Sequence, residues 1–459
     1  MLATKTDDFI EKQNHFFQTG KTKELHFRIE ALKKLKHLLI TNKEDLLLAL
    51  KQDFNKPSFE SIETELVFCT RQIDYVLKNL KSWTKPKRVP ADLFQLPASA
   101  RIIAEPLGVV LIIGAWNYPV QLTLSPLISA IAAGNCAIVK PSEITARTSI
   151  AIANLIRQAF PPEYITAIEG GKEVVQDLIA HKFDRIFFTG SSKVGKIIME
   201  AAAKHLTPVT LELGGKSPCI IEPDANIEIT AKRVVWGKFL NCGQTCIAPD
   251  YVLIHRSVKT AFLDKIEEKI AEFYGSDPEK SPDYARIVND FHFQRLLEAI
   301  APQKVAIGGK SNAETRYISP TVMDNVTWSD RIMEEEIFGP ILPLIEYDDL
   351  EDAIAQISAR PKPLALYLFT QNQNTQKRVL QATSSGTVCL NDTVMQIVSE
   401  HLPFGGVGES GMGTSHGKIG FDTFSHQKSI LQNSFWFDLP LRYPPYTQIK
   451  AQFFNFFLR

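Results

Sequence analysis

Apolar side chains in the N-terminal part of the chain recur at the spacing of an amphipathic helix. Residues 1 to about 82 look helical, and lysines occupy the face opposite the apolar one. Pro57 interrupts the pattern before a second helical stretch from Ser61 to Trp83. The clearest apolar run is Ile29, Leu32, Leu35 and Leu39. The sequence therefore predicts helices whose lysine-rich faces are solvated.

Further along, short β-branched runs alternate with helix-like segments. Strands are expected at 109–113, 137–139, 165–168 and 185–188. Helices are expected at 122–133, 145–159, 174–180 and 193–204, the second with Thr145 as its N-cap. Strands and helices that alternate at this pace form βαβ units, so the prediction is an α/β fold with a doubly wound, mostly parallel sheet.

The alternation continues beyond Pro208 and indicates a second α/β unit. Its expected elements are strands at 209–211 and 219–221 and a helix near 227–240. A length of 459 residues also favours two or three structural units over a single core. Pro-rich stretches near 86–97 and 440–445 mark excursions out of both units.

Charge and composition exclude several classes of protein. Lysine plus arginine and aspartate plus glutamate both number 51, so no overall charge draws the chain to nucleic acid or to an anionic membrane. The N-terminus does not read as a secretory signal, and the longest apolar run, 107–115, falls short of the roughly 20 residues of a membrane span. Six scattered cysteines indicate a reduced, cytoplasmic protein rather than a disulfide framework.

Two segments at strand ends are candidates for holding a nucleotide. The loop from Gly190 through Ser191 to Gly195 lies between an expected strand and helix, where free N–H groups can bind a phosphate. Its Gly-x4-Gly spacing matches neither the G-x-G-x-x-G fingerprint nor an ATP-type P-loop. Lys140 and Glu143 follow another strand and could hold ribose hydroxyls. A glycine turn and a capped surface helix explain these residues equally well.

A cysteine in a glycine-containing turn is the first candidate for chemistry. Cys246 follows Gly243 in such a turn, and a cysteine thiolate attacks carbonyl carbons well. With Cys242 four residues earlier, the same pattern also fits two buried thiols or a metal pair. Zinc would require further Cys or His residues at ligand spacing, and none is close, so no metal site is expected.

Other candidates are polar residues at strand ends and turns. Glu212 precedes a double glycine and could act as a general base, although a salt-bridged glutamate is the more frequent case. Asn117 follows the strongest expected strand and could donate to a developing oxyanion. Glu336 lies in an acidic turn with the aromatic Phe338 two residues on.

Taken together, these segments resemble the aldehyde dehydrogenase superfamily. The matching motifs are Gly-x-Trp-Asn-Tyr-Pro, Lys-Pro-Ser-Glu, Phe-Thr-Gly-Ser, Glu-Leu-Gly-Gly-Lys-Ser-Pro, Gly-Gln-x-Cys and Glu-Glu-Ile-Phe-Gly-Pro, in the family's order over residues 114–340. The segments 403–413, 416–417, 424–426 and 443–446 resemble the class-three subgroup, which includes fatty and aromatic aldehyde dehydrogenases.

The resemblance implies a role for each candidate in NAD(P)-dependent oxidation of an aldehyde to a carboxylic acid. Cys246 would be the nucleophile that forms a thioester, Glu212 the base that activates water, and Asn117 with the backbone N–H of Cys246 the oxyanion hole. The cofactor would be NAD, with NADP also accepted. Its expected contacts are Lys140 and Glu143 on the adenosine ribose, Gly190, Ser191 and Gly195 on the pyrophosphate, Glu336 on the nicotinamide ribose, and Phe338 beside it.

The resemblance also implies an architecture and a type of substrate. Residues 1–83 and 104–211 would form the Rossmann-like cofactor domain, 212–404 the catalytic domain, 84–103 and 405–430 strands that bridge two subunits of a homodimer, and 431–459 a C-terminal tail. The substrate would be lipophilic: a medium or long alkanal, an aromatic aldehyde or an isoprenoid-derived one. Phenylalanines in the tail favour packing on the protein or its partner subunit, with peripheral membrane contact as the alternative.

Two rival functions share the same residues. An aldehyde dehydrogenase that passes its thioester to CoA or phosphate has less need of a water-activating base, so Glu212 argues against it. A non-enzymatic structural protein on the same scaffold has no need of Cys246, Glu212 and Asn117 together. Cys242 has no part in the expected chemistry. It is either a bystander, which is the favoured interpretation, or a thiol that traps Cys246 in a disulfide.

Overall fold

The computed structural model describes residues 2–92 and 95–458. Residues 1, 93–94 and 459, which belong to the predicted segments 1–83, 84–103 and 431–459, lie outside this description. An N-terminal layer of helices begins the chain, as predicted, and Leu32, Leu35 and Leu39 are buried in it. Its elements are α1 (Leu2–Gln18), α2 (Leu25–Thr41), α3 (Lys43–Phe54), α4 (Ser58–Ser61), a π-helical turn (Ile62–Val67) and α5 (Phe68–Trp83).

A six-stranded sheet forms the first α/β unit and confirms the predicted fold class. The strand order is β17-β7-β6-β3-β4-β5, and every pairing is parallel except that of β17 with β7. The strands are β3 (Val109–Ile113), β4 (Cys136–Lys140), β5 (Ile165–Ala167), β6 (Arg185–Thr189), β7 (Val209–Glu212) and β17 (Gly411–Met412). The helices are α6 (Pro119–Ala133), α7 (Ala146–Ala159), α8 (Lys172–Ala180) and α9 (Ser192–Ala203).

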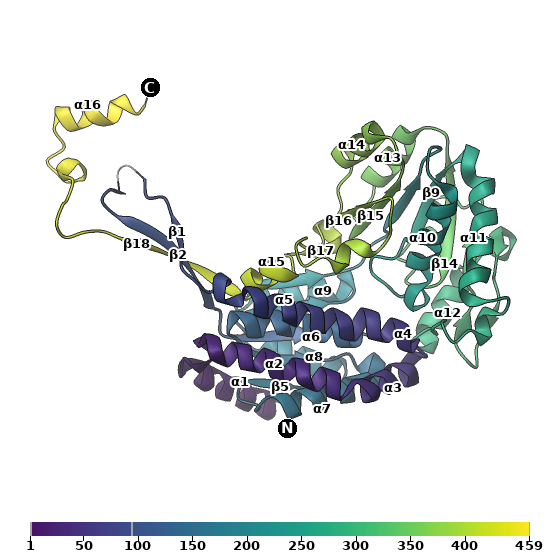
Figure 1. Ribbon diagram of the computed structural model, residues 1–459, viewed down its shortest axis with the longest axis horizontal. Coiled ribbons are helices and arrows are strands. Elements are labelled where there is room, and N and C mark those ends of the chain that lie inside the picture. The colour runs from purple at the N-terminus through teal and green to yellow at the C-terminus, as the bar shows by residue number, and fades with distance from the viewer. Residues whose placement is uncertain (1, 93–94, 459) are drawn as a thin grey trace.

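A seven-stranded sheet forms the second α/β unit, shown at the upper right of Figure 1. Its order is β10-β13-β14-β9-β8-β15-β16. The strands are β8 (Pro218–Ile221), β9 (Tyr251–His255), β10 (Val305–Ile307), β13 (Thr321–Met323), β14 (Ile341–Tyr347), β15 (Ala365–Phe369) and β16 (Thr387–Leu390), and a hairpin joins β11 (Ser311–Asn312) to β12 (Tyr317–Ile318). The helices are α10 (Ile227–Phe239), α11 (Lys259–Tyr274), α12 (Asp290–Ala299), α13 (Leu350–Ser358) and α14 (Gln373–Ala382).

One local prediction is wrong. The strand at 209–211, counted with the second unit, is β7 and pairs in parallel with β6 of the first sheet. Thr145 is the N-cap residue of α7, as predicted, although its side chain makes no capping bond. Asp53 of α3 supplies that cap instead, because its carboxylate accepts from the backbone N–H groups of Arg147, at 3.1 Å, and Thr148, at 2.8 Å.

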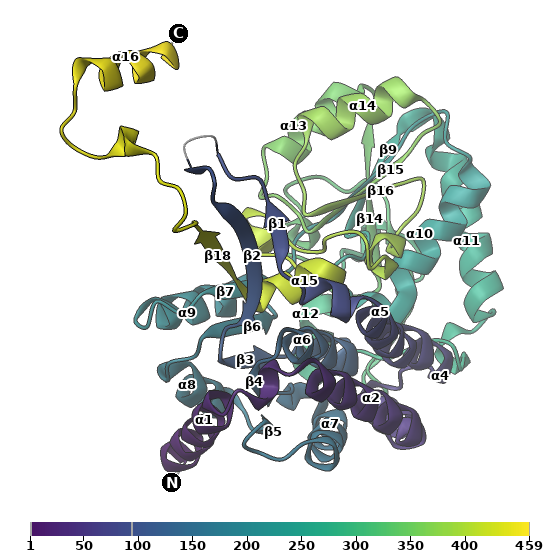
Figure 2. The same ribbon diagram turned by 60° about the vertical axis from the view of Figure 1, so that its left-hand side comes forward.

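A third sheet extends away from the two larger ones. It contains β1 (Lys87–Val89), β2 (Ser99–Pro106) and β18 (Ser425–Gln432), and β2 pairs with β18 along its whole length. Of the segment 405–430, only β18 lies in this sheet, since its glycine-rich start forms β17 and then α15 (Gly417–Thr423). Figure 2 shows the long β2 running outward from the first sheet, with the tail and its helix α16 (Gln448–Phe456) beyond β18.

Candidate active site

A cavity of about 240 Å³ has both Cys246 and Glu212 in its wall. Its lining comes from α5, α6, strands β6 and β7 of the first sheet, and the second unit. Most of the lining side chains are apolar, among them Phe68, Leu122, Trp236, Val394, Ile397 and Phe404. A cavity with apolar walls and a few polar groups suits a ligand that is apolar except at its reacting end.

A sharp turn after α10 brings Cys246 to this cavity. Asn241 and Cys242 adopt left-handed φ angles of 54° and 56°. Gly243 also has a positive φ, and a Cβ there would lie 2.2 Å from the carbonyl oxygen of Gly339, so only glycine fits. The Gln244 side chain then fixes the loop, because it donates to the carbonyl of Arg286 at 3.0 Å and accepts from Val288 N–H at 2.9 Å.

The thiol of Cys246 lies in a desolvated environment. Burial raises its pKa to about 12, and the Glu336 and Glu212 carboxylates add to the rise. In this state the thiol is protonated at neutral pH, so a base must take its proton before the sulfur can attack a carbonyl.

Glu212, the last residue of β7, places its carboxylate in the wall of the same cavity. Its Oε1 accepts a hydrogen bond from Ser415 Oγ at 3.0 Å, and its buried Oε2 has no partner among the described residues. Desolvation raises the pKa of this carboxyl group to about 8, while the Ser415 bond lowers it. A carboxylate with such a pKa and one unengaged oxygen can accept a proton from water near neutral pH.

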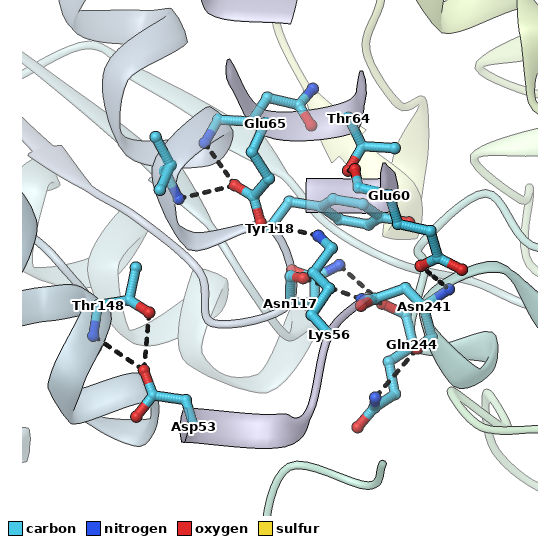
Figure 3. A network of polar contacts seen from close by, with 12 residues as sticks. Asp53, Lys56, Glu60, Thr64, Glu65, Asn117, Tyr118, Thr148, Asn241 and Gln244 are labelled. Carbon is cyan, nitrogen blue, oxygen red and sulfur yellow. Dashed lines mark hydrogen bonds and ion pairs between the residues drawn. The ribbon is translucent and has the colours of Figure 1, made fainter. Parts of the chain in front are cut away.

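Asn117 lies between β3 and α6 and contacts the loop that carries the cysteine. Its Nδ2 donates to the carbonyl of Gln244 at 3.1 Å, and its own carbonyl accepts from Asn241 Nδ2 at 2.9 Å (Figure 3). An amide nitrogen has two hydrogens, so a second donor remains after the bond to Gln244. The structure thus brings the three predicted catalytic residues together, two in the cavity wall and Asn117 against the loop.

The predicted ribose contacts lie at the carboxyl end of β4. Lys140 is buried, and its Nζ is 2.5 Å from Glu143 Oε2. The Glu143 side chain is 46% exposed, so its carboxylate is accessible to a ligand. A cationic donor beside a carboxylate acceptor is a suitable pair for the two hydroxyls of a ribose.

The predicted phosphate loop has the strand–glycine–helix form that binds anions. Gly190 N–H donates to the Glu212 carbonyl at 3.0 Å, which ties this loop to the end of β7. Ser191 is the N-cap of α9, and its hydroxyl accepts from Val194 N–H at 3.4 Å. At Gly195, in the first turn, a Cβ would approach Leu213 Cδ2 to 2.9 Å.

The acidic turn around Glu336 lies against the double glycine that follows β7. A Cβ on Gly214 would come within 1.9 Å of Glu336 Oε2, so the absent side chain makes room for this carboxylate. Burial, and then repulsion from Asp250, raise the pKa of Glu336 to about 8. Phe338 has a φ of 49° and meets the ring of Trp116 edge-on at 5.2 Å.

The sequence patterns do not identify several residues that contact the candidate catalytic residues or their loops. The N-terminal lysines are expected to be solvated, yet Lys56 is fully buried in an ion pair with Glu65. Glu60 accepts from Asn241 N–H at 3.0 Å, and Ser415 Oγ donates to Glu212. The only signal near Lys56 is the helix break at Pro57, which does not indicate that the preceding lysine is buried.

Cys242 belongs to the hydrophobic core of the second unit. Its side chain is fully buried, and burial raises its pKa to about 12. This position fits the bystander interpretation. Within the described ranges 2–92 and 95–458, the cysteine, histidine and acidic side chains form no cluster that could hold a metal ion. No helix in the same ranges combines the length and apolar character of a membrane span.

Comparison with known proteins agrees with this geometry. Residues 2–430 match the sequence model of the aldehyde dehydrogenase family. The chain belongs to the aldehyde dehydrogenase family. It is accordingly an oxidoreductase that uses NAD(P) to oxidise an aldehyde to the carboxylic acid.

Individual relatives cover nearly the whole chain. It is 46% identical over 451 residues to aldehyde dehydrogenase family 3 member A2 of Pongo abelii, covering 98% of this chain and 93% of that protein. It is 48% identical over 446 residues to the 4,4'-diaponeurosporen-aldehyde dehydrogenase of Staphylococcus aureus, covering 96% and 97%. The substrate-bound structure of Staphylococcus aureus AldH superposes with a TM-score of 0.97 at 46% identity and covers 99% of both chains. An indole-3-acetaldehyde dehydrogenase solved with NAD+ has a TM-score of 0.85 at 28% identity and covers 94% and 89%.

Proposed function

We propose that the enzyme oxidises a lipophilic aldehyde with Cys246 as nucleophile, Glu212 as base and Asn117 as oxyanion donor. The supporting observation is that Cys246 and Glu212 lie in the wall of one largely apolar cavity, with Glu212 Oε2 unengaged. Such a cavity accepts an aldehyde with an apolar chain and presents its carbonyl group to the sulfur.

Formation of the thioester uses the residues as follows. The Cys246 proton passes to solvent, and the sulfur adds to the aldehyde carbon. The carbonyl oxygen then carries the negative charge, which the Asn117 amide and the Cys246 N–H stabilise. When the tetrahedral adduct collapses, the C=O bond re-forms and the carbon loses a hydride. The bound nicotinamide ring supplies the acceptor for that hydride. Cys246 is left as a thioester.

Hydrolysis of the thioester returns the enzyme to its starting state. Glu212 takes a proton from water, and the resulting hydroxide attacks the thioester carbon. The C–S bond breaks, the acid leaves, and the Cys246 thiolate takes back the proton that Glu212 holds. The raised pKa of Glu212 makes it a stronger base than an ordinary carboxylate, and its position in the apolar cavity brings it to the water that attacks.

The residues present fit a nicotinamide dinucleotide. Lys140 and Glu143 offer a donor and an acceptor, and Gly190, Ser191 and Gly195 form a helix N-terminus for the pyrophosphate. Glu336 lies against Gly214 after β7, and Phe338, two residues on, packs against Trp116. NAD is the preferred cofactor in this proposal, with NADP tolerated. In this proposal the cofactor domain comprises residues 1–83 and 104–211, and the catalytic domain that supplies the nucleophile comprises residues 212–404. Strands within 84–103 and 405–430 bridge a homodimer.

Measurement of NADH formation with purified enzyme tests the proposal. The panel should contain short and long alkanals, an aromatic aldehyde and an isoprenoid-derived one, each with NAD or NADP and with or without CoA. We expect the free acid as product, a higher kcat/KM for the longer aldehydes, and no requirement for CoA. Release of an acyl-CoA would instead favour the CoA-acylating enzyme, and absence of NADH formation with every aldehyde would contradict the proposal.

A further inference from the structure

A buried ion pair lies behind the catalytic loops, and the mechanism above does not use it. Lys56, between α3 and α4, places its Nζ 2.8 Å from Glu65 Oε1 in the π-helical turn (Figure 3). Both side chains are 0% exposed. Because two charges lose their hydration on burial, such a pair is weak evidence of added stability. Its contacts indicate a different role.

Glu65 holds the beginning of α6. Its second oxygen, Oε2, accepts from the backbone N–H groups of Val120 and Gln121, both at 2.9 Å. These groups belong to the first turn of α6, where a carboxylate also interacts favourably with the helix dipole. Asn117 lies only three residues before Val120, so Glu65 anchors the turn that carries the oxyanion donor.

Lys56 connects the same pair to the nucleophile loop. Its Nζ lies 3.9 Å from the centre of the Tyr118 ring, within cation–π range. The Tyr118 hydroxyl is 2.7 Å from Thr245 Oγ1, and Thr245 directly precedes Cys246. The ammonium group therefore touches the residue that joins the Asn117 turn to the Cys246 loop.

The neighbouring Glu60 strengthens this arrangement. Its Oε2 accepts from Asn241 N–H at 3.0 Å, at the left-handed turn before Cys246. The segment 56–65 thus contacts both catalytic loops through three charged side chains. It also includes part of the π-helical turn Ile62–Val67, a conformation that is found frequently at functional sites.

We propose that the Lys56–Glu65 pair is a positioning unit that holds Asn117 in register with the Cys246 loop and so sets the rate of attack on the aldehyde. The inference rests on the proposed function, because it acts through the oxyanion donor. Neither residue touches substrate. A small displacement of a catalytic donor lowers the rate, whereas the cofactor site at β4 and α9 is held by other residues.

Substitution of both partners separates positioning from stability. Lys56→Met alone leaves a buried carboxylate unpaired and should lower the melting temperature, whereas Lys56→Met/Glu65→Gln removes both charges and should restore much of it. We expect the double variant to form its first equivalent of NADH roughly 10- to 100-fold more slowly, with an unchanged Kd for NAD. Lys304→Met/Asp330→Asn is the matched control, since that ion pair has no residue in the cavity wall and should leave the rate unchanged.

A double-mutant cycle tests whether the pair acts through Asn117. In an Asn117→Ala background, the pair variant should cause little further loss, because the donor that it positions is gone. Independent, multiplying effects, or a wild-type rate in a folded pair variant, would overturn the inference. Glu65→Gln gives the same comparison if the double variant does not fold. Should Asn117→Ala itself react at the full rate, the assignment of the oxyanion donor fails. Should Asn117→Ala be slow while the pair variants are fast, only the positioning role fails.

Discussion

Two cysteines four residues apart have opposite surroundings, and this difference separates their roles. Cys246 is half-buried in the cavity wall, whereas Cys242 is fully enclosed in the core of the second unit. Cys246→Ala should abolish NADH formation, because no other thiol is found among the described residues that line the cavity. Cys242→Ala should retain most of the activity. Alkylation by iodoacetamide, followed by mass spectrometry, should label Cys246 first. An inactive Cys242→Ala with an active Cys246→Ala would reverse the assignment.

Replacement of Glu212 tests its proposed role as a base, because it separates formation of the thioester from its hydrolysis. Glu212→Gln cannot accept a proton from water, so the thioester should form and then persist. Rapid-mixing kinetics should show a burst of NADH with little steady-state turnover, and intact mass should show the acylated enzyme. Rapid steady-state turnover in this variant would contradict the role of Glu212.

The hydrogen bond from Ser415 predicts a shift in pH dependence. Only the ionised form of Glu212 is a base, so thioester hydrolysis should rise with pH through a limb near the carboxyl pKa of about 8. The Ser415 bond stabilises the carboxylate and lowers that pKa, so Ser415→Ala should move the limb to higher pH and slow turnover at neutral pH. Ser125→Ala, also in the cavity wall, serves as the control. A limb that stays in place or moves to lower pH would count against this interpretation.

At the scale of elements, the hydrophobic pattern finds the parallel strands because they are buried on both faces. All five residues of β3 and of β4 are buried, so their apolar runs stand out in the sequence. The pattern does not reveal which sheet a strand joins, so periodicity alone counts β7 with the second unit, although it pairs with β6 of the first. The cap of α7 comes from Asp53, far away in sequence, and no local pattern could identify it.

In the candidate site, too, the sequence reveals some of the residues and misses others. Cys246, Glu212 and Asn117 follow glycine turns or strand ends, positions that a single sequence reveals. Lys56 lies at the break between two helices and Glu65 in the charged helical stretch that follows, and their importance depends on α6 folding against them. Burial of a charged side chain is a tertiary property, so periodicity alone predicts the opposite for both residues.

The carboxylate of Glu143, which follows β4, leads us to expect a preference for NAD over NADP. The half-exposed Glu143 would face the 2′-phosphate of NADP with a like charge, a repulsion of about 1 kcal/mol at roughly 4 Å in a water-like dielectric. We therefore expect a several-fold preference for NAD in the wild type. Glu143→Gln should narrow it, as measured by the ratio of kcat/KM for the two cofactors. A wild-type preference for NADP would refute this role of Glu143.

At the scale of the whole molecule, the C-terminal tail leaves the body beyond β18 (Figures 1 and 2). Phe435 and Trp436 are almost fully exposed along it, at 107% and 98%. On α16 the ring of Phe453 contacts those of Phe454 and Phe457 at 5.6 and 5.4 Å, and all three side chains remain 40% or more exposed. Within a single subunit the tail therefore keeps much of its apolar surface uncovered, which a partner subunit or a lipid surface could cover.

Removal of the tail distinguishes contact with a lipid surface from contact with a partner subunit. If the helix rests at a membrane or beside the substrate entrance, deletion of residues 447–459 should lower kcat/KM for long-chain aldehydes while sparing short ones, and should reduce co-sedimentation with lipid vesicles. A triple variant, Phe453→Ser/Phe454→Ser/Phe457→Ser, keeps the length of the tail and removes its apolar face, so it should reproduce the effect. If the helix instead packs on a partner subunit, both variants should lose activity equally for all chain lengths, melt at a lower temperature and shift toward the monomer in sedimentation analysis.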